Sequence, residues 1–168
     1  GSFEKRKLTL AEESRISSFG IVDLAGFPKD RYYLYRSHWR PDTKTIHILP
    51  HWNWPDLVGK NVPVYVYTNG DEAELFINGK SQGKRRKDPD ADNVMDRYRL
   101  RWEHTVYYPG VVRVVAYREG KVLGEATVET TGEAESLRLS PDRTTLRADG
   151  DDLSFVTVEA VDDAGRVN

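Results

Sequence analysis

The sequence predicts a mainly β protein: an immunoglobulin-like antiparallel β-sandwich, preceded by one helix and followed by part of a second β-domain. Two Asn-Gly pairs, Asn69-Gly70 and Asn78-Gly79, divide the stretch Val64–Arg86 into strand-like runs. Arg97–Val106 alternates polar and apolar residues, as a half-buried antiparallel strand does. About seven such runs fall within roughly 85 residues, a density typical of a sandwich.

The first segment, residues 1–43, combines an irregular arm with one predicted helix. The arm, residues 3–17, is charged and only weakly periodic. A helix is expected from about Pro28 to Ser37, because proline suits the first helical position and Asp30 would lie in the first turn. The run Tyr32–Tyr35 makes this helix apolar on most sides, so we expect it to be buried against something large.

The middle segment, residues 44–131, is predicted to form the sandwich. Asn-Gly most readily supplies the two positive φ angles of a type I′ turn, so both pairs are expected to fold strands back at corners. Leu100 and Trp102 share a face with Tyr98, and this face should meet the apolar face of Val64–Arg86. The other expected strands are Thr45–Leu49, Asn61–Thr68, Val111–Arg118 and Val122–Thr130.

The last segment, residues 132–168, is predicted to be a linker followed by the first strands of a further domain. Strand-like runs occur at Ser136–Leu139, Thr144–Arg147 and Leu153–Val161, with turn residues between them. Three strands are too few to close a second sandwich. We therefore expect a truncated β-domain here.

Charge is distributed unevenly along the chain. The net formal charge is +3 over residues 1–40, zero over residues 41–131 and −5 over residues 132–168, which indicates modular organisation. The neutral middle argues against a nucleic-acid partner, although Lys84–Lys87 is a short basic run. No stretch approaches the roughly 18 apolar residues of a membrane helix, so no membrane partner is predicted.

The chain has no cysteine, which excludes disulfides and thiolate metal sites. Without cysteines the redox compartment cannot be inferred. Localisation stays open, with a periplasmic or secreted parent protein as one option.

The aromatic loop Pro50–Pro55 is the main candidate for carbohydrate contact. Indole rings such as those of Trp52 and Trp54 stack on the apolar faces of sugars, and the neighbouring His and Asn could supply directional hydrogen bonds. The alternative is that the tryptophans only pack the loop against the sandwich or the helix, which is their more usual role.

No metal site, cofactor or catalytic residue is assigned. His47 and His51 have a spacing that binds zinc on a helix, but a proline and β-branched neighbours disfavour a helix there. Residues 88–92 repeat aspartate at alternate positions, yet Asn93 and Arg99 stand where an EF-hand needs Gly and Glu. A looser calcium site stays open. No nucleophile motif is present, and no catalytic pair can be chosen among the carboxylates.

Four stretches in order resemble the C-terminal part of bacterial glycoside hydrolase family 2 enzymes of the β-galactosidase type. They are FGIVDLAGFPKDRYYLYRSHW (Phe19–Trp39), HILPHWNWP (His47–Pro55), VPVYVYTNGDEAELFINGKSQGK (Val62–Lys84) and YYPGVVRVVAYREGKVLGEATVETTG (Tyr107–Gly132). The resemblance implies that Phe19–Trp39 is the end of a TIM barrel, with Pro28–Ser37 as its eighth helix. It further implies that residues 44–131 are the immunoglobulin-like domain that follows the barrel.

The resemblance also implies which chemistry this chain lacks. Family members use one Glu as acid/base and a second, about 5 Å away, as nucleophile. Both would lie on earlier barrel strands, so we expect the chain alone to be inactive. It would instead support a parent enzyme that hydrolyses terminal β-galactosides, with the missing barrel and that enzyme's carbohydrate substrate as its partners.

The resemblance implies that Ser18, Phe19 and Gly20, just after the eighth barrel strand, would lie nearest the parent's substrate. Phe19 is the candidate for sugar contact, although a packing role is the simpler interpretation. The competing hypothesis for the whole chain is a free-standing carbohydrate-binding or adhesion module of a secreted multidomain protein. The helix separates the two: compact packing without an exposed aromatic patch would favour the module.

Overall fold

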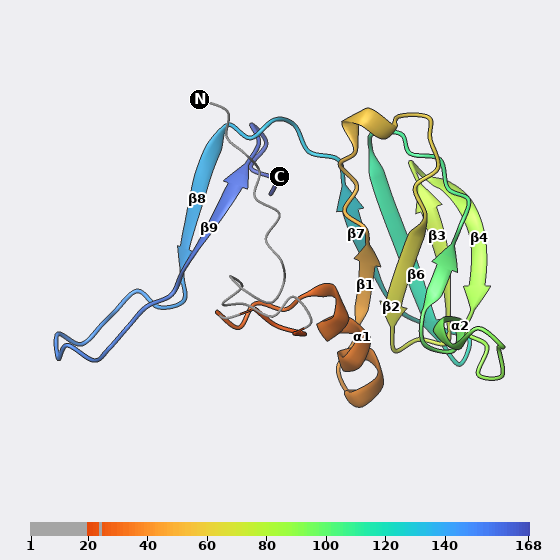
Figure 1. Cartoon of the computed structure of the whole chain (residues 1–168), viewed down its shortest axis with the longest axis horizontal. Coiled ribbons are helices and arrows are strands. Elements are labelled where there is room, and N and C mark those ends of the chain that lie inside the picture. Colours follow the sequence, from red (N-terminus) through yellow and green to blue (C-terminus); the bar gives the residue numbers. More distant parts are fainter. Residues whose placement is uncertain (1–19, 24) are drawn as a thin grey trace, which may run out of the picture.

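The computed structural model describes residues 20–23 and 25–168, and within them the chain is mainly β (Figure 1). The predicted N-terminal arm and Phe19 lie outside the described residues. The helical elements are α1 (Asp30–Trp39), a short 3-10 turn (Pro55–Leu57) and α2 (Val94–Tyr98). The strands are β1 (Ile46–Leu49), β2 (Val64–Thr68), β3 (Glu72–Ile77), β4 (Lys80–Arg86), β5 (Leu100–Trp102), β6 (Val111–Arg118), β7 (Lys121–Glu129), β8 (Ser136–Pro141) and β9 (Val156–Val161).

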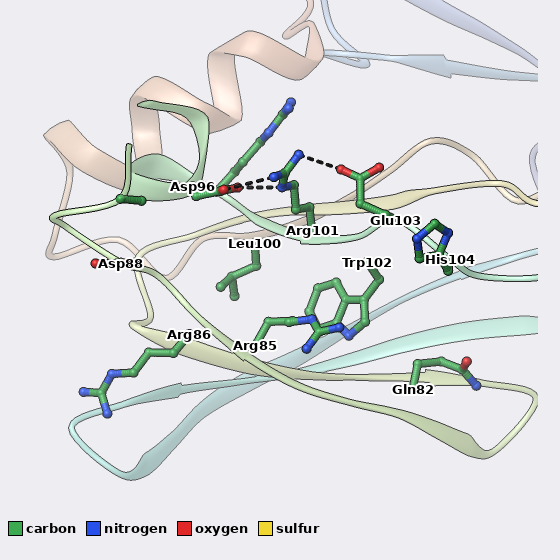
Figure 2. Close-up of a pocket in the computed structure, with 12 residues that line it drawn as sticks. Gln82, Arg85, Arg86, Asp88, Asp96, Leu100, Arg101, Trp102, Glu103 and His104 are labelled. Atoms are coloured by element: carbon green, nitrogen blue, oxygen red, sulfur yellow. Dashed lines mark hydrogen bonds and ion pairs between the residues drawn. The ribbon is translucent and has the colours of Figure 1, made fainter. Parts of the chain in front are cut away.

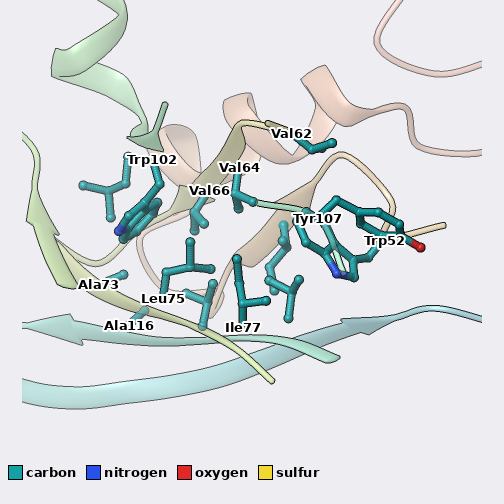
Figure 3. Packing of buried hydrophobic residues seen from close by; sticks show 14 residues of the cluster. Trp52, Val62, Val64, Val66, Ala73, Leu75, Ile77, Trp102, Tyr107 and Ala116 are labelled. Atoms are coloured by element: carbon teal, nitrogen blue, oxygen red, sulfur yellow. The ribbon is translucent and has the colours of Figure 1, made fainter. Parts of the chain in front are cut away.

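The first seven strands form two packed antiparallel sheets, which confirms the sandwich. One sheet has the order β1-β2-β5 and the other β4-β3-β6-β7. Their inner faces meet in a single core, in which aliphatic side chains of β2, β3 and β6 interdigitate (Figure 3). The fully buried members include Val64, Val66, Leu75, Leu100, Val112 and Val114. As predicted, Leu100 and Trp102 pack against the apolar face of β3.

The two Asn-Gly pairs form different connections: one is a hairpin turn, and the other links the two sheets. The expectation of a type I′ turn at both was therefore wrong. Asn78-Gly79 joins β3 to β4 with positive φ angles of 49° and 80°, as a type I′ turn requires. Asn69-Gly70 instead carries the chain from one sheet to the other, and neither residue has a positive φ. The Asn69 side chain accepts from the Thr45 N–H (3.0 Å) and donates to the Thr43 carbonyl (2.8 Å). Those long-range bonds hold a crossover where a hairpin was expected.

The strand predicted over Arg97–Val106 is shorter than its alternation indicated. Only Leu100–Trp102 is strand, and Tyr98 ends α2 and is 46% exposed. Asn93 caps α2 by accepting from the Met95 N–H (3.0 Å). The capped helix α2 therefore occupies the start of the alternating stretch, and the strand begins only at Leu100.

Helix α1 begins two residues later than predicted, since Pro28 pairs in an isolated bridge with Val22 and Lys29 is the N-cap. The helix packs on the outer face of the β1-β2-β5 sheet. The Asp30 carboxylate lies 2.8 Å from His47 Nε2, and the Tyr33 ring stacks on the same imidazole at 4.0 Å. Helix and sandwich are thus joined by a hydrogen bond and a ring stack.

The C-terminal strands β8 and β9 form a separate hairpin that stands apart from the sandwich (Figure 1). The run Thr144–Arg147 is not a strand, contrary to expectation, and lies in the long irregular connection between β8 and β9. Apolar side chains of the hairpin are largely exposed: Leu137 by 67%, Leu139 by 63% and Val158 by 58%. The hairpin covers little of its own apolar surface.

Candidate functional site

The aromatic loop between β1 and β2 is held by packing. Trp52 is 1% exposed, and its ring meets Tyr107 edge-on with the centroids 5.1 Å apart. Its indole N–H donates to the Tyr108 carbonyl at 3.1 Å. No face of the Trp52 ring is therefore free to stack on a sugar in this structure.

Trp54 lies at the rim of the same loop. It is partly buried against the core and stacks on the His51 ring with the centroids 4.2 Å apart, while its indole N–H donates to the His51 carbonyl (2.8 Å). The loop is anchored on the far side by Asn53, whose amide donates to Thr131 (3.0 Å). Carbohydrate contact at this loop and at Phe19 stays a prediction, with Trp54 the more accessible of the two tryptophans.

The outward side of α1 presents aromatic surface. The rings of Tyr35 and Trp39 stack with the centroids 4.7 Å apart, yet these residues are 38% and 69% exposed. Phe27, just before the helix, is 47% exposed. A helix held to the sandwich on one side therefore offers an unpartnered aromatic pair on the other.

Acidic side chains in two loops, one of them the run at residues 88–92 considered for calcium, serve as local hydrogen-bond acceptors. Asp88 accepts from the Asp90 N–H (3.0 Å), and Asp149 accepts from the N–H groups of Asp151 and Asp152 (3.0 Å each). Among the residues that the structure describes, no group of three or more His, Asp or Glu is arranged to hold a metal ion. No helix within the described part is long and apolar enough to cross a bilayer.

A pocket of about 450 Å³ opens at the side of the sandwich between the edge strands β4 and β5 (Figure 2). Leu100 and Trp102, each 2% exposed, contribute its apolar part. Its polar lining comes from β4, from the loop and helix α2 before β5, and from the residues after β5. Sequence reasoning did not find this pocket.

The basic run Lys84–Lys87 is divided by the pleat of β4. Lys84 and Arg86 pair on the outer face with Glu72 (3.2 Å) and Asp71 (2.9 Å). Arg85 pairs in register with Ala73, which is fully buried, so its side chain leaves the strand on the core side and extends along the pocket toward Trp102 (Figure 2). The alternation of the run was the signal that could have revealed an inward arginine.

A carboxylate cluster neutralises another arginine at the pocket. Arg101 lies 2.6 Å from Asp96 and 2.7 Å from Glu103 (Figure 2). The guanidinium of Arg99 lies over the Tyr65 ring at 4.5 Å. Arg101 is therefore paired with carboxylates, whereas Arg99 contacts the ring and its buried Nε has no hydrogen-bond partner among the described residues.

Two family models match the chain. Residues 59–124 match "Domain of unknown function (DUF4982)", and residues 137–168 match "Glycoside hydrolase family 2 C-terminal domain 5". The first match covers most of the sandwich, and the second covers the β8–β9 hairpin with its connection.

Curated relatives are much longer than this chain. "Beta-galactosidase BoGH2A" of Bacteroides ovatus is 50% identical over 155 residues, which are 92% of this chain and 17% of that protein. A "Beta-glucuronidase" of Formosa agariphila is 30% identical over 151 residues, which are 88% of this chain and 14% of that protein. The chain thus spans about a sixth of the length of these relatives.

Solved structures of longer proteins contain a region with the same fold as this chain. A glycosyl hydrolase family 2 member from Bacteroides cellulosilyticus superposes with a TM-score of 0.79 at 35% identity, over 90% of this chain and 22% of that one. A beta-glycosidase from Bacteroides vulgatus gives 0.77 at 32% identity, over 89% and 18%.

Proposed function

Because this chain belongs to the C-terminal region of glycoside hydrolase family 2 proteins, we propose that it is a non-catalytic accessory region that supports a catalytic barrel. The observation that carries the proposal is the exposed aromatic surface of α1. A stacked Tyr35–Trp39 pair with Trp39 69% exposed is costly to leave in water and suits burial against another part of the same protein.

The proposed substrate class is a terminal β-galactoside. It rests on the 50% identity with the Bacteroides ovatus β-galactosidase, which exceeds the 36% and 30% identities over similar lengths with a putative β-glucuronidase and a β-glucuronidase of Formosa agariphila. In this proposal the barrel supplies the acid/base and nucleophile carboxylates, and the sandwich supplies a rigid base for the last barrel helix.

A free-standing carbohydrate-binding or adhesion module is the second candidate. The compact docking of α1 through Asp30, Tyr33 and His47 favours it, since a self-contained module would hold its helix in this way. The exposed Tyr35–Trp39 pair on the same helix argues against it. We therefore rank the accessory role first.

The first test is hydrolysis by the purified chain. With p-nitrophenyl β-galactoside as substrate, we expect no release of nitrophenol above the background rate. In this proposal the chain contributes only the last barrel helix, and the barrel strands that carry the two carboxylates belong to the rest of the enzyme. Measurable turnover that co-purifies with the chain would refute the proposal.

A second test asks whether α1 is covered in a longer protein. In a chimera, residues 20–168 would replace the matching region of the Bacteroides ovatus enzyme. Trp39→Ala should lower the free energy of unfolding of the chimera by about 3 kcal/mol, as loss of a buried Trp does. In the isolated chain the same change should cost less than about 1 kcal/mol.

Tyr108→Ala is the matched control, since Tyr108 is an exposed aromatic residue (54%) in the loop before β6. Its effect should be small in both proteins. Equal effects of Trp39→Ala in the chimera and the isolated chain would mean that the helix stays uncovered, and the module would then be the better hypothesis.

A further inference from the structure

The open side of the sandwich holds an arginine that the fold does not pair. Arg85 leaves β4 on the core side, opposite Ala73, and lines the pocket with its side chain extending toward Trp102 (Figure 2). Within the described residues it has no side-chain hydrogen bond and no ion pair, whereas the neighbouring Lys84 and Arg86 both pair with carboxylates. Arg85 is an exposed residue that lines the open side of a partly apolar pocket. Its guanidinium can there donate charge-assisted, bidentate hydrogen bonds to an anion.

The pocket also offers groups suited to hydroxyls. The Gln82 amide nitrogen donates to the Lys80 carbonyl (3.0 Å), which leaves the amide oxygen as an acceptor. His104 lines the pocket and has no hydrogen-bond partner among the described residues. Three carboxylates line the pocket. Asp96 and Glu103 pair with Arg101, and Asp88 accepts from the Asp90 N–H, so none of them forms an ion pair with Arg85.

We propose that this pocket binds an acidic saccharide, with Arg85 donating hydrogen bonds to a carboxylate or sulfate group on the sugar. The volume of about 450 Å³ lies within the roughly 300–1,000 Å³ of small-molecule sites. One charged group held at Arg85 and hydroxyls held at Gln82 and His104 match the chemistry of such a ligand. The anionic group is inferred from the pocket alone. That this group belongs to a saccharide rests on the proposed function.

Calorimetric titration of the purified chain tests the proposal. The probes are trigalacturonic acid, galactose 6-sulfate and a neutral galactotriose. We expect at least one acidic probe to bind about tenfold or more tightly than the neutral one, and the stronger of the two acidic probes identifies the group. Arg85→Gln should weaken that binding about tenfold or more, the usual effect of losing a charge-assisted hydrogen bond. Arg85→Lys should give an intermediate loss, because it keeps the charge and loses the fork of donors.

Lys84→Gln is the matched control: it removes the same charge from the adjacent residue on the outer face. Its binding should stay within about twofold of the unchanged chain, and thermal melts would confirm that all variants fold. Equal losses in Lys84→Gln and Arg85→Gln, or equal binding of neutral and acidic probes, would overturn the proposal. Arg85 would then be an inward charge that protects the edge strand from pairing. Because this readout is binding by the chain alone, it can fail independently of the tests of the accessory role.

Discussion

At the scale of single residues, charged side chains hold the point where the chain changes sheets. The Lys87 ammonium donates to the Thr68 carbonyl, and Arg118 donates twice to the Asn69 carbonyl (2.9 and 2.7 Å). Burial lowers the pKa of Lys87 to about 8, an effect that Asp71 opposes and Arg118 reinforces. The carbonyls left unpaired by the crossover are thus satisfied by cations.

Lys87 predicts a pH dependence of stability. Its folded pKa of about 8 lies below the unfolded value of about 10.4. The unfolded chain therefore binds more protons between these values, and stability rises with pH across that window. The cost of the buried charge is fully present below about pH 8 and is lost toward pH 10.

The measurement is urea unfolding of the chain and of Lys87→Met at pH 7 and pH 10. Relative to the variant, the unchanged chain should gain on the order of 2 kcal/mol between the two values. Parallel stability curves would show that Lys87 titrates normally in the folded protein.

At the scale of elements, the two Asn-Gly corners differ in what restrains them. A Cβ added at Gly70 would lie 2.4 Å from the Tyr117 carbonyl oxygen, which accepts the Asp71 N–H at 2.9 Å and so cannot easily move. At Gly79 a Cβ would meet nothing within 4 Å, but the φ of 80° is strained for any residue with a side chain. Position 70 therefore requires glycine because a Cβ would clash, and position 79 requires it because φ is positive.

Gly70→Ala and Gly79→Ala therefore form a matched pair. We expect Gly70→Ala to cost about 3 kcal/mol, the upper range for forcing atoms into a packed site. Gly79→Ala should cost about 1 kcal/mol from the left-handed backbone alone. Equilibrium unfolding in urea gives both values, and the reverse order would contradict the assignment of the crossover and the turn.

At the scale of the whole molecule, the sandwich is expected to be more stable against local unfolding than the β8–β9 hairpin. The sandwich has a continuous buried core, whereas a lone two-stranded hairpin is marginally stable in water. Asp162, 2% exposed, ties the hairpin to the linker: it accepts from the Gly132 N–H (2.9 Å) and pairs with Arg166 (2.7 Å). These bonds lower the pKa of Asp162 to about 2, and the hydrogen bond from the Gly132 N–H has the largest effect.

Amide hydrogen exchange should show this difference in local stability. Amides of β6 should exchange only on global unfolding, and those of β8 and β9 through local opening. Because the folded pKa of Asp162 lies below its unfolded value, its stabilising effect is present above about pH 4 and is lost as pH falls toward 2. Asp162→Asn should remove that pH dependence from the hairpin. Uniform protection of β6, β8 and β9 would contradict the prediction.

The sequence by itself determined the features that depend on neighbours along the chain. Alternation over Arg97–Val106 marked Leu100 and Trp102 as facing the core, and Asn78-Gly79 marked a tight turn, because pleat and turn geometry act within a few residues. The four stretches resembled the C-terminal part of family 2 glycoside hydrolases, and the comparisons confirmed that resemblance.

Only the tertiary structure decided what depends on residues far apart in the sequence. Asn69-Gly70 became a crossover through bonds to Thr43 and Thr45, more than twenty residues away. Trp52 became a core residue because Tyr107 and the Tyr108 carbonyl meet it there. Arg85 acquired a pocket because two edge strands from different sheets lie side by side. Local periodicity shows which face a side chain takes, but the groups that meet it on that face are set by how the sheets pack.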